Sequence, residues 1–288
     1  MAHGPAGVAF GRQARQHRGV SVTTFIRESV APLVDLIYPP RCPVCGEGIA
    51  HQDGLCSNCW SELSIPGAPA CALCQRPFGT DFATDGSVCA PCLGSPPRHD
   101  GIAAGTIYND AARKLVLAFK HGRRIALAPM LARLIAARLP PLDGEWLVAP
   151  VPLHRWRLWR RGFNQAGLIA RELSRLPGGN LAVDALRRRK RTPMLGGLGR
   201  KARARALSGA IVADERWAER IRGANVVLVD DVLTSGATSD ACVAALKRAG
   251  ATRVVVACFS RVIEEAGRAG GSRNPKNETP GAEAPGAT

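Results

Sequence analysis

The chain has 288 residues, 46% of them hydrophobic, which is enough to bury one core together with a small second domain, or to form two modest domains. No stretch approaches the roughly 20 apolar residues of a membrane helix. The N-terminus lacks the apolar core of a signal peptide, so we expect a cytoplasmic protein without membrane insertion. The formal net charge of +16 favours an anionic partner, unless it only keeps the protein soluble.

The chain begins with a segment, 1–37, that we interpret as a tail with a short helix. Its first part is rich in Gly, Arg and His and shows no periodicity. Apolar residues recur at helical spacing only from Ile26 to Ile37, where Pro32 interrupts them.

Residues 38–97 form a cysteine-rich module. It holds eight of the ten cysteines as four closely spaced pairs: Cys42 and Cys45, Cys56 and Cys59, Cys71 and Cys74, and Cys89 and Cys92. Each pair presents two thiolates to one ion, and two pairs complete a tetrahedral shell that suits zinc. We therefore predict a double zinc ribbon with two structural zinc ions, paired sequentially. A crossed pairing, a single zinc with redox-active thiols, and an iron–sulfur centre are the alternatives.

Residues 98–262 alternate between strand and helix patterns. Expected strands cover 102–108, 146–149, 181–186, 224–229 and 253–259, and expected helices cover 111–119, 127–139, 163–176 and 238–249. Strands separated by helices of this length predict an α/β domain with a mostly parallel sheet. We predict a mobile loop over 187–208, a disordered tail over 263–288, and buried structural thiols at Cys242 and Cys258.

The segment from Val226 to Thr238, VVLVDDVLTSGAT, carries the clearest functional signal. Its apolar run predicts a strand covered on both faces, with Asp230 and Asp231 at the end where open α/β sheets bind ligands. Adjacent carboxylates repel each other unless hydroxyls or cations lie between them. Hydroxyl and backbone N–H groups of the loop that follows can surround a phosphate at the start of a helix. The loop residues are Thr234, Ser235, Gly236, Ala237 and Thr238.

This segment resembles the phosphoribosyl-pyrophosphate (PRPP) signature of type I phosphoribosyltransferases. Four further features narrow the resemblance to the ComF family: the double ribbon, Tyr108 with Lys120, the segment from Pro150 to His154, and that from Arg161 to Gln165. The resemblance covers about residues 40–261 and implies the sheet of the type I phosphoribosyltransferase fold behind a small double zinc ribbon. Members of that family are associated with natural competence and with incoming single-stranded DNA.

The resemblance also implies roles for individual residues. Asp230 and Asp231 would bind the ribose hydroxyls of PRPP, and the loop from Thr234 to Thr238 its 5-phosphate. His154 and Arg155 would contact pyrophosphate, where positive charge and Mg²⁺ stabilise the leaving group.

The remaining roles fall on the flanking segments. Arg161 and Asn164 either join the pyrophosphate contacts or anchor their loop. Arg203 would be catalytic in a closing hood over 191–209. In that hood Leu195 and Ala206 stand where the family pattern has Gln and Asn, which weakens the case for full transferase chemistry.

Two functions are compatible with these features. The first is a ComF-like protein that binds PRPP or a related ribose 5-phosphate group and handles single-stranded DNA, with a competence-machinery protein such as a helicase as a further partner. The second is an active phosphoribosyltransferase of nucleotide metabolism with an unidentified acceptor.

The charge distribution bears on the first function. Residues 149–209 hold fifteen basic and two acidic residues. Trp156 and Trp159 lie among arginines there, an arrangement that suits single strands, whose bases stack. Packing of the tryptophans against a helix, and a solvated basic surface, are the alternatives.

Overall fold

The computed structural model describes residues 39–51, 54–78, 84, 86–121, 124–153, 159, 162–189, 207 and 209–263. In this part of the chain, a five-stranded sheet has the order β1-β7-β6-β2-β3. Its strands are β1 (Ile102–Ile107), β2 (Trp146–Pro150), β3 (Gly179–Leu181), β6 (Asn225–Leu233) and β7 (Arg253–Arg261). Every neighbouring pair is parallel, which confirms the predicted α/β class.

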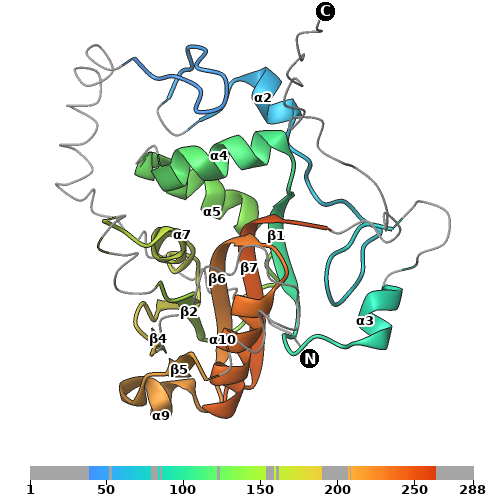
Figure 1. Cartoon of the computed structure of the whole chain (residues 1–288), viewed down its shortest axis with the longest axis vertical. Coiled ribbons are helices and arrows are strands. Elements are labelled where there is room, and N and C mark those ends of the chain that lie inside the picture. Colours follow the sequence, from blue (N-terminus) through green and yellow to red (C-terminus); the bar gives the residue numbers. More distant parts are fainter. Residues whose placement is uncertain are drawn as a thin grey trace, which may run out of the picture.

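Helices cover both faces of the sheet (Figure 1). One face packs against α4 (Asp110–His121), α5 (Ala128–Ala136), which follows the 3-10 turn η1 (Ile125–Leu127), and α7 (Gln165–Leu173). The other face packs against α10 (Ala237–Arg248). Because both faces are covered, the centre of β6 is a continuous apolar run, and Val226 to Val229 are fully buried. None of the helices in the described ranges is long and apolar enough to cross a membrane.

The prediction of a single strand over 181–186 is wrong. Strand β3 ends at Leu181, and β4 (Leu186–Arg188) forms a separate antiparallel pair with β5 (Ile211–Ala213). The N–H of Ala185 bonds to the carbonyl of Ala182, so the chain turns between the two strands. Periodicity alone does not distinguish two short strands joined by a turn from one longer strand.

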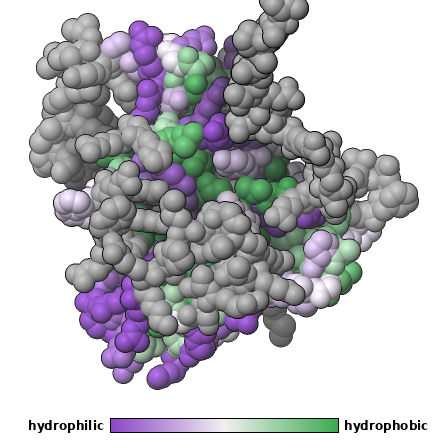
Figure 2. All heavy atoms as spheres, in the orientation of Figure 1, coloured by the Kyte–Doolittle hydropathy of each residue, from purple (hydrophilic) through white to green (hydrophobic). Residues whose placement is uncertain are grey.

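Ion pairs fix the base of the β4–β5 pair, where η2 (Glu215–Trp217) and α9 (Ala218–Ile221) follow. Asp214 pairs with both Arg187 and Arg216. The hydrogen bonds from Arg216 lower the pKa of the Asp214 carboxyl. Asp184 accepts the indole N–H of Trp217 at 2.9 Å. Figure 2 shows hydrophilic residues gathered at the lower left, where Figure 1 has these elements. Arg187, in the basic stretch, is therefore engaged by a carboxylate.

The cysteine module covers one of the two edge strands of the sheet, β1. Its first half, with α2 (Ser57–Ser61), contributes Leu63 to the core on the α4 face. Its second half, with α3 (Ala90–Gly94), shares the core on the α10 face. Two backbone N–H groups of β1 donate to the module: Ala104 to the Gln75 side chain at 3.1 Å, and Ile107 to the Ser64 carbonyl at 2.7 Å. An uncovered strand edge invites pairing with other chains, and the module covers this one.

The two halves of the module repeat one local structure. Each has a residue in the left-handed region whose N–H bonds back to the first cysteine: Gly46 (φ 83°) to Cys42 and Gln75 (φ 52°) to Cys71. Glycine adopts this conformation freely, whereas glutamine is strained there. The Gln75 side chain makes the contact with β1 that a glycine lacks, which explains the residue type.

Gln75→Ala is expected to lower the free energy of unfolding by about 2 kcal/mol, because it orphans the Ala104 N–H and keeps the backbone strain. Gln75→Gly loses the same hydrogen bond but relaxes the backbone, so it should be about 1 kcal/mol less damaging than Gln75→Ala. Urea unfolding measures both values. If the two variants were equally stable, the backbone strain at Gln75 would be contradicted. If both were as stable as the wild type, the contribution of the hydrogen bond to Ala104 would be contradicted.

Candidate functional site

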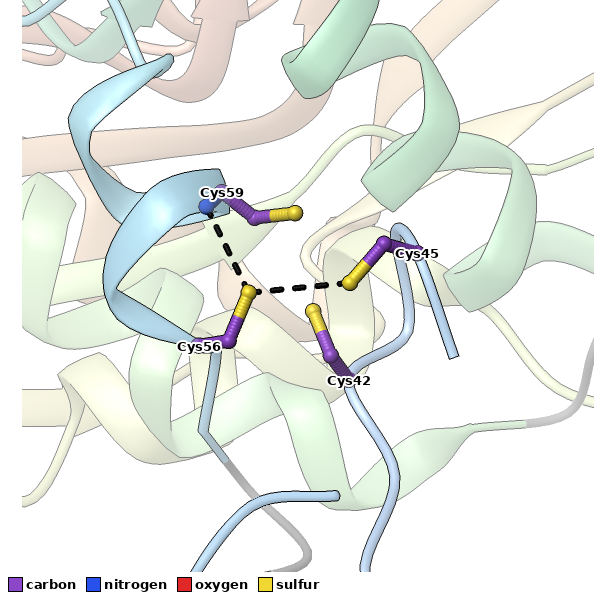
Figure 3. Close-up of side chains that lie close together, drawn as sticks. All are labelled: Cys42, Cys45, Cys56 and Cys59. Atoms are coloured by element: carbon purple, nitrogen blue, oxygen red, sulfur yellow. Dashed lines mark hydrogen bonds between the residues drawn. The ribbon is translucent and has the colours of Figure 1, made fainter. Parts of the chain in front are cut away.

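The first four cysteines of the module converge on one point. Figure 3 shows the side chains of Cys42, Cys45, Cys56 and Cys59 directed toward a common centre. Their sulfur atoms all lie within 4.8 Å of one another. Cys56 is the N-cap of α2 and accepts the N–H of Cys59 at 3.5 Å. The Sγ atoms of Cys45 and Cys56 are 3.6 Å apart. This matches the edge of about 3.8 Å in a tetrahedron with zinc–sulfur bonds of about 2.3 Å.

The last four cysteines form a second centre of the same kind. Their sulfur atoms also lie within 4.8 Å of one another, and the Sγ atoms of Cys74 and Cys89 are 3.6 Å apart. The Cys71 sulfur accepts the N–H of Cys89 at 3.3 Å, and all four residues are buried: Cys71, Cys74, Cys89 and Cys92. The cysteines are thus grouped sequentially, as predicted.

Both centres fit a closed structural zinc site. Four thiolates leave no coordination position for a substrate, so neither centre is suited to catalysis. Burial opposes ionisation of Cys42 and Cys71, but backbone N–H groups near their sulfurs lower the pKa of each thiol to about 6. Burial raises the pKa of Cys59 and Cys92. A divalent cation is therefore needed to hold four thiolates in each shell.

Strand β6 extends past its predicted end at Val229, so that boundary is wrong. Pairing with β7 continues from Asp230, opposite Cys258, to Leu233, opposite Arg261. The apolar pattern stops at Val229, but the partner strand keeps the backbone extended beyond it. Asp230 and Asp231 therefore lie within the strand, and their side chains point to opposite faces of the sheet.

Asp231 is paired with a lysine on the α4 face. Its Oδ2 atom lies 2.6 Å from Nζ of Lys120, and the two side chains are 18% and 21% exposed. Its Oδ1 atom accepts the N–H of Val232 at 2.7 Å. The burial of Leu115 and Phe119 positions α4, and with it Lys120, over this strand end. The cation expected near the two carboxylates is therefore Lys120, a contact that the sequence did not predict.

Asp230 points to the α10 face, toward two buried thiols. Burial and then the charge of Asp230 raise the pKa of Cys242 and Cys258, both fully inaccessible as predicted. Burial, followed by the charge of Asp231, raises the pKa of Asp230 well above its ordinary value. Its Oδ1 atom accepts the N–H of Asp231 at 2.9 Å. A carboxyl group perturbed in this way is typical of functional sites.

The loop after β6 leads directly into the N-terminus of α10. Gly236 is the N-cap residue, with a φ of 75° that glycine adopts without strain. The helix begins at Ala237, one residue before the predicted start. Its first N–H groups and its dipole favour an anion at this end. The predicted loop residues thus lie at the same edge of the sheet as Asp230 and Asp231.

Several predicted site residues lie outside the described ranges: His154, Arg155, Trp156, Arg161, Leu195, Arg203 and Ala206. Trp159 is described and is 83% exposed, so its ring does not pack against a described helix. Asn164 donates from Nδ2 to the carbonyl of Val151 at 3.3 Å. This contact supports the interpretation that Asn164 anchors the segment after β2 to the start of α7.

Comparisons with known proteins match both parts of the chain. A family model described as a double zinc ribbon domain matches residues 33–93, and one described as a phosphoribosyl transferase domain matches 158–274. DNA utilization protein YhgH of Escherichia coli (strain K12) is 31% identical over 226 residues, covering 73% of this chain and 98% of the relative. Competence protein F of Haemophilus influenzae is 31% identical over 230 residues, covering 75% of this chain and 94% of the relative.

A solved structure, that of TT1426 from Thermus thermophilus, is 19% identical to this chain. The match covers 51% of this chain and 86% of the TT1426 chain, and its TM-score of 0.28 is too low to support a shared fold.

Proposed function

The chain belongs to the ComF family, which joins a double zinc ribbon to a phosphoribosyltransferase domain, and on this premise we propose that it binds PRPP or a related ribose 5-phosphate group. Asp230 and Asp231 hold the ribose hydroxyls, and the loop from Thr234 to Thr238 holds the 5-phosphate. The observation that carries this proposal is the order of groups along one sheet edge, where two carboxylates precede a loop at a helix N-terminus.

The charges at this edge support a hydroxyl-bearing, phosphorylated ligand. Lys120 neutralises Asp231, so the two carboxylates present at most one net negative charge to a ligand. Mg²⁺ bound with the diphosphate would neutralise the leaving group. His154 and Arg155 remain the proposed contacts of pyrophosphate, and Arg203 the proposed catalytic residue of the hood.

Single-stranded DNA is the proposed macromolecular partner. The names of the relatives, DNA utilization protein and competence protein, support this choice. The basic stretch over 149–209 and the exposed indole of Trp159 supply cations and a stacking surface. A competence-machinery protein such as a helicase is a further proposed partner, and the cytoplasm is the proposed location.

An active phosphoribosyltransferase of nucleotide metabolism is the second candidate. The intact arrangement from Asp230 to Thr238 favours it, since the same groups would bind PRPP for transfer. Leu195 and Ala206 count against it, because they remove two amide side chains from the proposed hood.

PRPP with Mg²⁺ is expected to stabilise the protein by about 2.7 kcal/mol at a concentration of about 100 times its Kd. The double substitution Asp230→Ala and Asp231→Ala should abolish this stabilisation in a thermal-shift assay. Asp143→Ala is a matched control, because this exposed carboxylate precedes β2, at the opposite edge of the parallel sheet. An unchanged PRPP shift in the double variant would overturn the proposed site.

The same variants separate the two candidate functions. Pyrophosphate release from PRPP that disappears in the double variant would favour the enzyme. Oligonucleotide binding that survives in the double variant, and weakens steeply with salt, would favour the DNA-handling protein.

A further inference from the structure

A cavity of about 470 Å³ lies between the second zinc centre and the loop after β6. Its volume falls within the range of about 300–1,000 Å³ that is typical of ligand sites. One wall is the cysteine module with the linker that follows it, including Pro91, Pro96 and Pro97. The opposite wall is the loop from Thr234 to Gly236 and the first turn of α10.

The cavity extends away from the proposed ribose site. Its floor comes from Ile102 of β1 and from Val256 of β7, and neither Asp230 nor any residue of β2 lines it. In the sheet order, β7 and β1 lie on one side of β6 and β2 lies on the other. The phosphate loop is thus a wall shared between the proposed sugar-phosphate site and this cavity.

Among the described residues, three arginines line the cavity, Arg76, Arg98 and Arg261, against one carboxylate, Asp240. Nη1 of Arg261 is buried and has no hydrogen-bond partner among the described residues, so an acceptor that reached it from the cavity would satisfy it. Burial and the charge of Arg261 lower the pKa of His99 to about 4, so the arginines provide the positive charge at neutral pH.

The second half of the cysteine module borders the cavity, and it differs from the first half in the charge of one residue. A zinc ion with four thiolates has net charge −2 and would repel an anion. Arg76 offsets part of that charge at the second centre. Its carbonyl accepts the N–H of Cys71, just as the carbonyl of Glu47 accepts that of Cys42 in the first half. The half that borders the cavity therefore has a cation where the other half has an anion.

We propose that this cavity receives the nucleotide on the 5′ side of a single-stranded DNA phosphate held by the loop from Thr234 to Thr238. This inference rests on the proposed function, because it uses the same phosphate position. The 5-phosphate of PRPP is a monoester, so that ligand ends at the loop. A phosphodiester continues beyond the loop into a further sugar and base. The arginines suit the next phosphate along the strand, and the proline-lined wall suits the sugar and base.

The test compares two charge reversals with a fluorescent (dT)12 probe at fixed salt. Arg98→Glu, at the exposed mouth of the cavity, is expected to weaken (dT)12 binding about tenfold, and Arg98→Ala less. Arg248→Glu, an exposed position at the other end of α10, should change it by less than about twofold. Neither reversal should change the affinity for ribose 5-phosphate, and ribose 5-phosphate should displace (dT)12 from the wild type. Zinc content is measured for each variant to show that the module is intact.

The outcomes distinguish this inference from the proposed function. Equal weakening by Arg98→Glu and Arg248→Glu would overturn the cavity as the path of the strand. Ribose 5-phosphate that binds the wild type without displacing (dT)12 would also overturn it, while the proposed function would stand. Absence of any binding by ribose 5-phosphate and PRPP would overturn the proposed function itself.

Discussion

Cys92→Ser is expected to remove one of the two zinc ions and to lower the melting temperature of the protein by about 10 °C. The reason is that Cys92 and its three partners lie in the same core as Val226 and Leu228 of β6 and Val243 of α10. Opening the second zinc centre therefore unpacks one face of the sheet. Calorimetry measures the transition, and native mass spectrometry counts the zinc ions.

The first zinc centre provides the comparison for this prediction. Cys42, Cys56 and Cys59 form a cluster of their own. Cys59→Ser should therefore also remove one zinc ion but lower the melting temperature less than Cys92→Ser. Cys242→Ser, a buried thiol outside both centres, should keep both ions. This account would be contradicted if Cys92→Ser still bound two zinc ions, or if Cys92→Ser and Cys59→Ser had equal melting temperatures.

Asp230→Asn is expected to raise the stability of the ligand-free protein by about 1 kcal/mol at pH 7.5 and to abolish PRPP binding. Burial and the neighbouring Asp231 raise the pKa of Asp230 in the folded state. The folded protein then holds this proton more tightly than the unfolded chain does. Stability should therefore fall as pH rises from the ordinary aspartate pKa through the raised value, and the neutral amide should remove that loss.

The pH dependence and a neighbouring substitution test this explanation. The advantage of Asp230→Asn should vanish below about pH 4, where the carboxyl is protonated in both states. Asp231→Asn should not share the gain, because it removes the partner of Lys120. Urea unfolding at several pH values measures both variants. A loss of stability in Asp230→Asn at pH 7.5, or a gain independent of pH, would rule out burial of the charge as the cause.

Much of this protein could be predicted from local patterns. The spacing of the eight cysteines predicted two four-thiol centres, because a turn with two intervening residues places both sulfurs on one side. The apolar run before Asp230 predicted a central parallel strand, because only a strand covered on both faces has no polar alternation. The glycine and hydroxyl residues from Thr234 to Thr238 predicted the turn into α10.

Predictions failed where partners distant in sequence decide the structure. The end of β6 depends on β7, which pairs with Leu233 through Arg261. The segment over 181–186 divides because β3 pairs with β2 while β4 pairs with β5. Neither pairing leaves a signal in the local periodicity of the strands that it extends or divides.

The sequence by itself determined which side chains are available for chemistry: eight thiolates for zinc, two carboxylates, and a phosphate-binding loop. Only the tertiary structure decided their surroundings. It brought Lys120 to Asp231, left Asp230 partly buried beside two buried thiols, and placed the second zinc centre across a cavity from the loop. Ligand type follows from local spacing along the backbone, whereas charge balance and cavity shape depend on elements that meet only when the sheet and its helices pack together.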